Sequence, residues 1–249
     1  MEIPLVAIIG NIGSGKSTAA CILEKEFNFT RMSFAHELRA TCVKLIVHHR
    51  WPNETPVDIL ESYADCFGML RSIEVDQAVL EIHMKPTTPR ARRLLQWYGT
   101  DYCRAKDPAC WAKLAMTRLN DLIRHSEAMG RLGKETLCGV VFDDLRFPEE
   151  LEALAQRGAR IWRIEGRGDT SRAHESESHW PAFEYHHLIY NPSVGDTDWE
   201  RMELSRKVRN LYRADFDGWW YCPTCTNAVE GRIFRLGRCP MCGAKESRP

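Results

Sequence analysis

A glycine-rich segment near the N-terminus constrains this chain more than any other feature. Its residues at 10–18 read Gly-Asn-Ile-Gly-Ser-Gly-Lys-Ser-Thr and fit the spacing G-x-x-x-x-G-K-[ST]. An apolar run at 4–9 comes before it and predicts a buried strand, and a helix-compatible run at 19–24 follows. This order of strand, loop and helix is the context in which the spacing indicates a phosphate-binding loop. A chance glycine-rich turn is the alternative, and both flanks argue against it.

The residue types of this loop suit the phosphates of a nucleotide. Glycines let backbone N–H groups turn inward around phosphate oxygens, and a helix N-terminus adds partial positive charge. Lys16 would bridge the β- and γ-phosphates, and Ser17 would hold Mg²⁺. The predicted ATP-phosphate site consists of Gly10, Asn11, Ile12, Gly13, Ser14, Gly15, Lys16, Ser17 and Thr18.

The composition argues against several classes of protein. The 249 residues allow one large domain with at most a small appendage. Lysine plus arginine and aspartate plus glutamate both total 34, so no net charge draws the chain to nucleic acid or to a membrane surface. We find no apolar run near the ~18 residues of a membrane span and no secretory signal. We therefore expect a cytoplasmic protein that does not bind membranes.

Apolar runs alternate with helical patterns over most of the chain. The strand-like runs are 4–9, 136–142, 159–164 and 188–190. The helical runs are 16–27, 33–47, 57–83, 91–99, 108–124, 148–156 and 196–213. Buried strands that alternate with helices argue for a parallel sheet covered on both faces. The sequence therefore predicts an α/β domain over residues 1–213.

Two carboxylates follow the second strand-like run. Asp143 and Asp144 come directly after it, and Arg146 stands two residues further on. Ligands bind at the carboxyl ends of strands in open α/β sheets, and an acid there can hold Mg²⁺ beside a phosphate-binding loop. The alternative is that the two aspartates cap the next helix. Beside the glycine-rich loop we favour ligand binding.

Five short motifs follow the loop in a characteristic order. They are Arg93-Leu-Leu-Gln96-x-x-Gly99-Thr100-Asp101, Trp111 with Lys113-Leu114, Asp144-x-Arg146-x-x-x-Glu150, His174-x-Ser176-Glu177, and Asn191 after a short strand. In this order, over residues 3–212, they resemble the bacteriophage deoxynucleoside monophosphate kinases. The resemblance implies a P-loop NTPase fold of the nucleoside-monophosphate-kinase kind. It also implies transfer of the ATP γ-phosphoryl group to a deoxynucleoside 5′-monophosphate, with Mg²⁺, in the host cytoplasm if the protein is phage-encoded.

The resemblance also implies roles for single residues. It adds Asn191 to the ATP site. The residues it places on the substrate side are Arg93, Gln96, Trp111, Asp144, Arg146, Glu150, His174 and Glu177. Trp111 offers a flat face for a base, although it begins an amphipathic helix and could equally be core. A structural histidine at 174 is as good an interpretation as a substrate contact.

Residues 166–172 resemble a mobile lid. Arg163, Arg167 and Arg172 could close over the transferring phosphoryl group, where arginines stabilise charge and a lid excludes water. A solvated basic loop is the alternative. The predicted catalytic set is Lys16, Asp144, Arg146, Arg167 and Arg172.

The last part of the chain carries two C-x-x-C pairs. Cys222 and Cys225 are separated from Cys239 and Cys242 by thirteen residues, and a proline follows the first cysteine of each pair. This spacing indicates a Cys₄ zinc ribbon over residues 217–249, in which four thiolates leave no open position and the zinc is structural. A tail with so few apolar residues needs the metal to fold. The other six cysteines lie in apolar contexts and are expected to be reduced.

The purpose of the ribbon is open at this level, because the phage kinases do not in general need one. Residues 219–249 carry a net charge of +3 and begin with Trp219 and Trp220, which fits contact with nucleic acid. The alternative is that the ribbon docks on the kinase domain or mediates a homodimer, and we favour it because +3 is modest.

Two other functions compete with the mononucleotide kinase. One is a kinase that acts on a nucleotide or modified base within DNA, with the ribbon holding the strand. The other is an ATP-dependent switch that binds nucleotide and has no acceptor. The base that is accepted depends on the shape of the pocket, which the sequence does not reveal.

Overall fold

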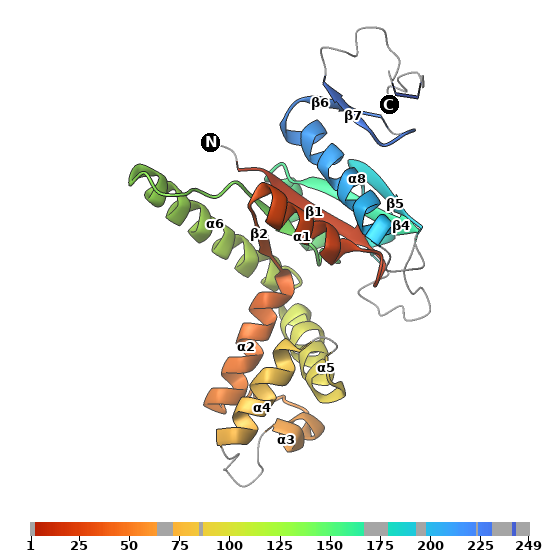
Figure 1. Ribbon diagram of the computed structural model, residues 1–249. Helices are drawn as coiled ribbons and strands as arrows, with labels where there is room; N and C mark the ends of the chain where they lie inside the picture. Colours follow the sequence, from red (N-terminus) through yellow and green to blue (C-terminus); the bar gives the residue numbers. More distant parts are fainter. Residues whose placement is uncertain are drawn as a thin grey trace. The chain divides into compact units, whose positions relative to one another are not determined.

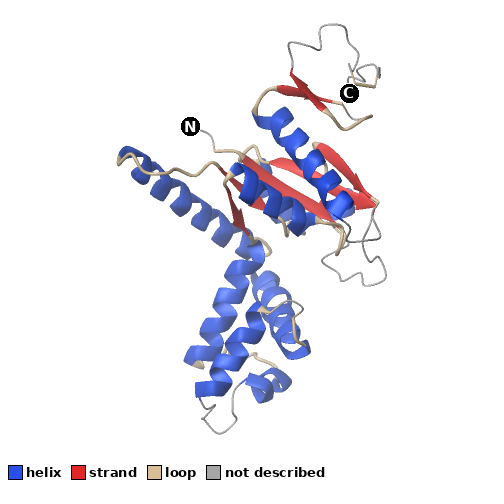
Figure 2. Ribbon diagram, in the orientation of Figure 1, coloured by secondary structure: helices blue, strands red, loops and turns tan. Residues whose placement is uncertain are grey.

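The computed structural model describes residues 3–63, 72–84, 87–166, 179–192, 198–222, 224–230 and 241–242 (Figures 1 and 2). The chain divides into two compact units. A sheet unit contains Met1–Met32 and Asp121–Pro249, and a helical unit contains Ser33–Asn120. The helical unit is therefore an insertion between two parts of the sheet unit.

The sheet unit is built on five parallel strands in the order β2-β3-β1-β4-β5. They are β1 (Leu5–Gly10), β2 (Phe29–Met32), β3 (Gly139–Phe142), β4 (Arg160–Gly166) and β5 (His187–Asn191). The central strand β1 pairs with β3 on one side and with β4 on the other, so that Val6 lies beside both Val141 and Arg160. The expectation of an α/β protein with a parallel sheet is confirmed.

Strand β2 was missing from the sequence interpretation. Its residues Phe-Thr-Arg-Met bury only the two ends, and so short a run with a polar middle has no strand signature of its own. The strand forms because each of its residues pairs with β3, from Phe29 beside Gly139 to Met32 beside Phe142. Tertiary pairing, rather than local preference, makes this segment a strand.

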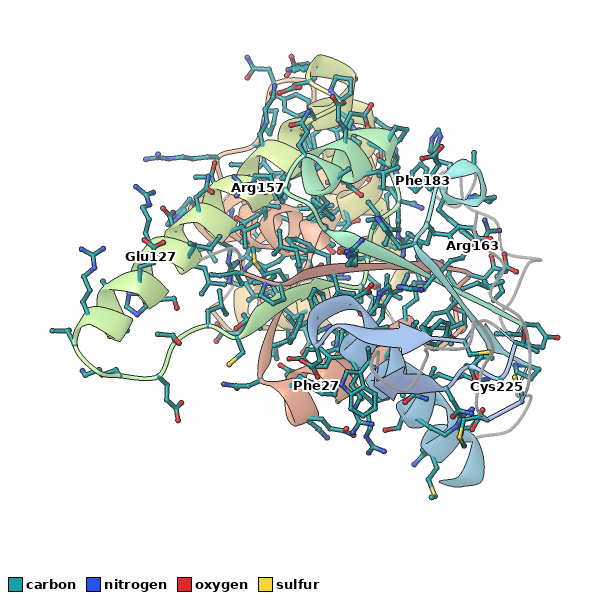
Figure 3. All side chains as sticks on the ribbon, turned by 90° about the horizontal axis from the view of Figure 1, so that it is seen from above. Phe27, Glu127, Arg157, Arg163, Phe183 and Cys225 are labelled. Atoms are coloured by element: carbon teal, nitrogen blue, oxygen red, sulfur yellow. The ribbon has the colours of Figure 1, made fainter. Side chains whose placement is uncertain are left out.

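Helices cover both faces of the sheet. The helices α1 (Lys16–Phe27) and α8 (Asp198–Phe216) lie side by side on one face (Figure 1). Figure 3 shows α7 (Pro148–Ala155), which ends shortly before Arg157, on the other side of the sheet from Phe27 at the end of α1. A 3₁₀ turn, η3 (Trp180–Ala182), precedes β5.

One apolar core joins α1 and α8 to the strands. Every residue of β1 is buried, which fits a central parallel strand covered on both faces. The buried members of this core are Val6, Ile8, Ala19, Ala20, Leu23, Phe29, Val141, Trp162, Ile164, Ile189, Leu204, Val208 and Leu211. The glycine-rich loop at 10–18 thus connects the buried strand β1 to helix α1, and α1 is held by its packing against the sheet and α8.

The strand order predicts a ligand-binding crevice between β1 and β3 at the carboxyl ends of the strands. The chain leaves β1 towards β2, which lies beyond β3 in the sheet. It leaves β3 towards β4, which lies on the other side of β1, so the two connections run in opposite directions. Ligands bind where connections diverge in this way, because the two loops leave space between them. The glycine-rich loop follows β1, and Asp143 with Asp144 follows β3.

The helical unit has a core of its own. It contains α2 (Phe34–His48), α3 (Val57–Tyr63), α4 (Ser72–His83), α5 (Pro89–Gln96) and the π-helix η1 (Trp97–Arg104), and it ends within α6 (Cys110–Arg131). Cys42, Ile46, Tyr63, Leu94 and Trp97 are among the buried residues. The expected helix at 91–99 continues as a π-helix to Arg104, and the one expected at 108–124 extends to Arg131.

The C-terminal segment belongs to the sheet unit. Two short antiparallel strands, β6 (Trp219–Tyr221) and β7 (Ala228–Glu230), follow α8. The aromatic ring of Tyr221 packs against the core of the sheet unit. Among the described residues, no helix combines the length and the apolar character that crossing a membrane requires.

We predict that Leu23→Ala lowers the free energy of unfolding by about 2–5 kcal/mol, because this fully buried side chain lies between α1 and the sheet and its loss leaves a cavity. Urea denaturation would measure the change. Leu132→Ala is the control, since that side chain is 69% exposed and its truncation should matter by less than about 0.5 kcal/mol. Equal effects of the two substitutions would contradict the packing described above.

Candidate functional site

The glycine-rich loop needs glycine at two of its positions for reasons visible in the structure. Gly10 has φ of 146° and Gly15 has φ of 108°, a region that residues with a side chain rarely enter. A Cβ on Gly10 would lie 2.3 Å from the carbonyl oxygen of Ile164, and one on Gly15 would lie 2.9 Å from Asn191 Nδ2. The loop can therefore sit tightly against β4 and the end of β5 only because these two side chains are absent.

Lys16 lies across this loop. Its ammonium group donates to the carbonyl oxygens of Gly10 at 2.5 Å and of Asn11 at 2.7 Å. Helix α1 begins at Lys16 with no acidic residue in its first turn and no side-chain cap at Gly15. The N–H groups of that first turn, together with the ammonium, form a positive site of the kind that anions occupy.

Two further groups complete the loop. Ser14 is fully buried, and its hydroxyl has no hydrogen-bond partner among the described residues. A buried polar atom without a partner is costly, and a phosphate oxygen would satisfy it. Asn191, at the end of β5, donates from Nδ2 to the carbonyl oxygen of Ser14 at 2.8 Å and is 7% exposed. The expected place of Asn191 at the ATP site is thus a contact with the loop backbone, and its contact with nucleotide stays a prediction.

An acid and an arginine face the start of α1. The carboxylate of Asp143, only 7% exposed at the end of β3, accepts from Ser17 Oγ at 2.8 Å. It also accepts from Arg31, through Nε at 3.2 Å and through Nη2. Arg31 stands on β2, so the parallel neighbours β2, β3 and β1 bring these three side chains together. Such charge-assisted bonds hold a carboxylate in one orientation.

Two features of this cluster were not anticipated. Of the two aspartates, it is Asp143 that contacts Ser17, whereas the sequence analysis named Asp144 as the catalytic acid. The second feature is Arg31, which no sequence motif marks, because the short strand that carries it has no strand signature of its own. Its only signal was indirect, namely a basic residue one position before the end of a short strand that runs beside β3. Asp144 is half-buried, and its catalytic role stays a prediction.

Glu150 has a structural task at the start of α7. Its side chain is 2% exposed, and Oε2 accepts from the backbone N–H of Arg146 at 3.0 Å and of Phe147 at 3.2 Å. The carboxylate thereby satisfies N–H groups at the helix N-terminus, and it holds the turn that carries Arg146. Roles for Arg146 and Glu150 in substrate binding stay predictions.

The remaining expected substrate residues in the described chain belong to the helical unit. Trp111 is 5% exposed, and its indole N–H donates to the carbonyl oxygen of Gly99 at 3.0 Å, which is the arrangement of a core tryptophan. Arg93 pairs with Asp58 at 3.1 Å, and Gln96 is half-buried. The structure thus gives Arg93 and Trp111 partners within their own unit, and substrate contacts stay predictions.

The proposed lid lies largely outside the described residues. Arg167, Arg172, His174 and Glu177 all fall in the undescribed segment 167–178. Arg163 is described on β4, where it pairs with Glu165 at 2.5 Å and donates to the carbonyl oxygen of Pro181 at 3.1 Å. Its guanidinium also lies 5.0 Å from the centre of the Trp180 ring. These contacts anchor η3 to β4.

Three cysteines of the C-terminal segment converge. The sulfur atoms of Cys222, Cys225 and Cys242 lie within 4.8 Å of one another, and those of Cys222 and Cys242 are 3.7 Å apart. Two corners of a tetrahedron with Zn–S distances of ~2.3 Å are ~3.8 Å apart, so the spacing suits zinc. Asn227 Nδ2 donates to the sulfur of Cys225 at 3.3 Å, a contact that favours a thiolate. This group could hold a metal ion; Cys239, the expected fourth ligand, lies outside the described residues.

No protein-family model matches this chain, and a comparison with curated proteins found no match. Residues and geometry therefore carry the assignment of function.

We predict that the purified protein contains one zinc ion per chain, measured by elemental analysis, because three sulfur atoms converge within 4.8 Å and those of Cys222 and Cys242 are 3.7 Å apart, close to the ~3.8 Å between two ligands of tetrahedral zinc. Cys222→Ser should abolish retention of the metal. Cys138→Ser is the control, since that exposed thiol belongs to a different part of the chain and its loss should leave the metal content unchanged. Metal-free protein with these cysteines paired as disulfides would exclude the site.

Proposed function

We propose that the protein transfers the γ-phosphoryl group of ATP to a deoxynucleoside 5′-monophosphate. The observation that carries this proposal is the meeting of Lys16, the Ser17–Asp143 pair and Arg31 at the carboxyl ends of neighbouring parallel strands. These are the parts that phosphoryl transfer needs, because the reaction depends on positioning and charge rather than on a covalent intermediate. The finer fold that goes with this function is the P-loop NTPase fold.

The donor side is the glycine-rich loop. Loop N–H groups and the start of α1 would surround the β- and γ-phosphates, and the Ser14 hydroxyl would gain the partner that it lacks among the described residues. The ammonium of Lys16 would exchange the carbonyl oxygens of Gly10 and Asn11 for phosphate oxygens. The exchange is favourable because a phosphate carries full charge and a carbonyl only a dipole.

The oxygens of Ser17 and Asp143 fit Mg²⁺, which prefers hard oxygen ligands and usually keeps several waters. When bound, the ion would neutralise charge on the phosphates. Arg31 would keep the Asp143 carboxylate aimed at Ser17. The zinc that we propose for the cysteines would be structural, because its four expected ligands are all thiolates.

The acceptor side rests on the order of the motifs. Asp144 and Arg146 follow β3 at the edge of the crevice, and Arg146 carries a charge that suits the acceptor phosphate. Arg93, Gln96 and Trp111 belong to the helical unit, and only the order of the motifs connects them with the acceptor. Free nucleotides are cytoplasmic, which is where we propose that the protein acts.

The deciding experiment incubates the protein with labelled ATP and each of the four deoxynucleoside monophosphates, their modified relatives and an oligonucleotide. We expect label to reach at least one free monophosphate. Lys16→Ala should show no transfer and keep the same circular dichroism, because it removes the charge at the phosphates and no buried apolar contact. Transfer to the oligonucleotide alone would favour a kinase that acts within DNA. Binding of ATP without any acceptor would favour a nucleotide switch.

The two aspartates after β3 should behave differently. We predict that Asp143→Asn raises the Mg²⁺ concentration needed for half-maximal activity and lowers kcat by about 100-fold, the size typical of one lost electrostatic contact. Asp144→Asn should act mainly on the KM of the monophosphate. A Mg²⁺ titration of both variants measures this, and a shifted requirement in Asp144→Asn alone would reverse the two roles.

A further inference from the structure

One turn of α8 lies beside the glycine-rich loop and bonds to the segment that follows Cys225. Towards the loop, Leu204 is buried in the sheet core, and its Cδ2 lies 3.3 Å from where a Cβ on Gly15 would stand. Lys207, three residues later, donates from Nζ to the carbonyl oxygen of Tyr190 at 2.7 Å. The next residue, Asn191, holds the Ser14 carbonyl oxygen. The position of this turn can therefore affect the loop at two places, beside Gly15 through Leu204 and through the Lys207 bond to the residue before Asn191.

Towards the cysteine cluster, the same turn presents Arg206. Its guanidinium donates to Asn227 Oδ1 at 2.7 Å and to Thr226 Oγ1 at 3.0 Å. Asn210, one turn later and only 7% exposed, donates to the carbonyl oxygen of Thr226 at 2.9 Å. Figure 3 labels Cys225 in the segment that these bonds hold. Helix α8 therefore forms hydrogen bonds with the side chains of Thr226 and Asn227 and with the backbone of Thr226, directly after Cys225.

Thr226 and Asn227, which α8 binds, also form hydrogen bonds with the cysteines of the cluster. The backbone N–H of Thr226 donates to the carbonyl oxygen of Cys222 at 2.8 Å, and the backbone N–H of Cys222 donates to the carbonyl oxygen of Asn227 at 2.9 Å. Asn227 donates to the sulfur of Cys225 through Nδ2 while it accepts from Arg206 through Oδ1. A single side chain thus touches a metal ligand and the helix that packs beside the loop.

Arg206 is itself held in place. Its two terminal nitrogens donate to Asn227 and Thr226. Glu203 accepts from Nε at 2.8 Å and from Nη2 at 2.7 Å. The hydrogen bond from Arg206 is the main cause that lowers the pKa of Glu203. The planar guanidinium suits this task, because its five donors have fixed directions.

We propose that Arg206 is a positioning residue that couples metal occupancy of Cys222, Cys225 and Cys242 to the affinity of the glycine-rich loop for ATP. The inference rests on the proposed function. The hairpin β6–β7 is too small to order itself, so the metal orders the segment at 222–227. The ordered segment fixes Arg206 and this turn of α8, where Leu204 lies beside Gly15 and Lys207 bonds to the carbonyl oxygen of Tyr190, the residue before Asn191. Coupling between two binding sites is reciprocal, so ATP should in turn retain the metal.

The test compares zinc-loaded full-length protein with two arginine variants of α8. Arg206→Ala removes the bonds to Asn227 and Thr226, whereas Arg209→Ala, the matched control, removes an ion pair with Glu26 on α1. Both side chains are more than a third exposed, so neither change should unfold the protein. ATP affinity is measured by titration calorimetry. Zinc release to a colorimetric chelator is followed with and without ATP.

We expect wild-type protein to bind ATP at least ~5-fold more tightly with zinc than after chelation, and ATP to slow zinc release. Arg206→Ala should lose both effects, and Arg209→Ala should keep both. Asn227→Ala should resemble Arg206→Ala, and the double variant should lose no more than either single one, because both changes break the same link. A structural role alone would not make zinc release depend on ATP.

Three results would overturn the inference. ATP affinity that is independent of zinc in wild-type protein would end it and leave the proposed function intact. Equal losses in Arg206→Ala and Arg209→Ala would show that any weakened helix contact has this effect. Wild-type protein that binds no ATP would overturn the proposed function together with the inference.

Discussion

Parallel pairing of β1 with β3 and β4 is the constraint on which the rest of this structure depends. Pairing with β4 brings the carbonyl oxygen of Ile164 so close to Gly10 that no side chain fits there, and the loop must turn away immediately. Pairing with β3 brings Asp143 to Ser17, across 126 residues of sequence. The glycine-rich loop and the acid are therefore brought together by the backbone pairing of the strands that precede them.

The side chains of the cluster are held by one another. Asp143 accepts from Ser17 and Arg31, Lys16 donates to two loop carbonyl oxygens, and Asn191 donates to the carbonyl oxygen of Ser14. These contacts fix the orientation of the Asp143 carboxylate, whereas the ammonium of Lys16 is engaged by the loop itself. Ser14 is the exception, because its buried hydroxyl has no hydrogen-bond partner among the described residues.

The C-terminal cysteines belong to the sheet unit and do not form a separate compact unit. Tyr221 packs into the core beside His187, and the segment that follows it is bonded to Arg206 and Asn210 of α8. This placement supports the interpretation in which the ribbon docks on the domain that precedes it.

The sequence by itself determined the class of fold, the loop at 10–18 and the cysteine spacing, because these depend on local periodicity and on motifs within a few residues of each other. Only the tertiary structure decided that Asp143 rather than Asp144 meets Ser17, since neighbouring residues after a strand point in different directions and no spacing rule selects one. The tertiary structure also decided that Phe29–Met32 is a strand, which brings Arg31 to the site. The cap by Glu150 is a local contact with the backbone of Arg146 and Phe147, four and three residues before it. The role of Trp111 as core follows from packing and from its bond to the carbonyl oxygen of Gly99, and such contacts leave no periodic signal in the chain.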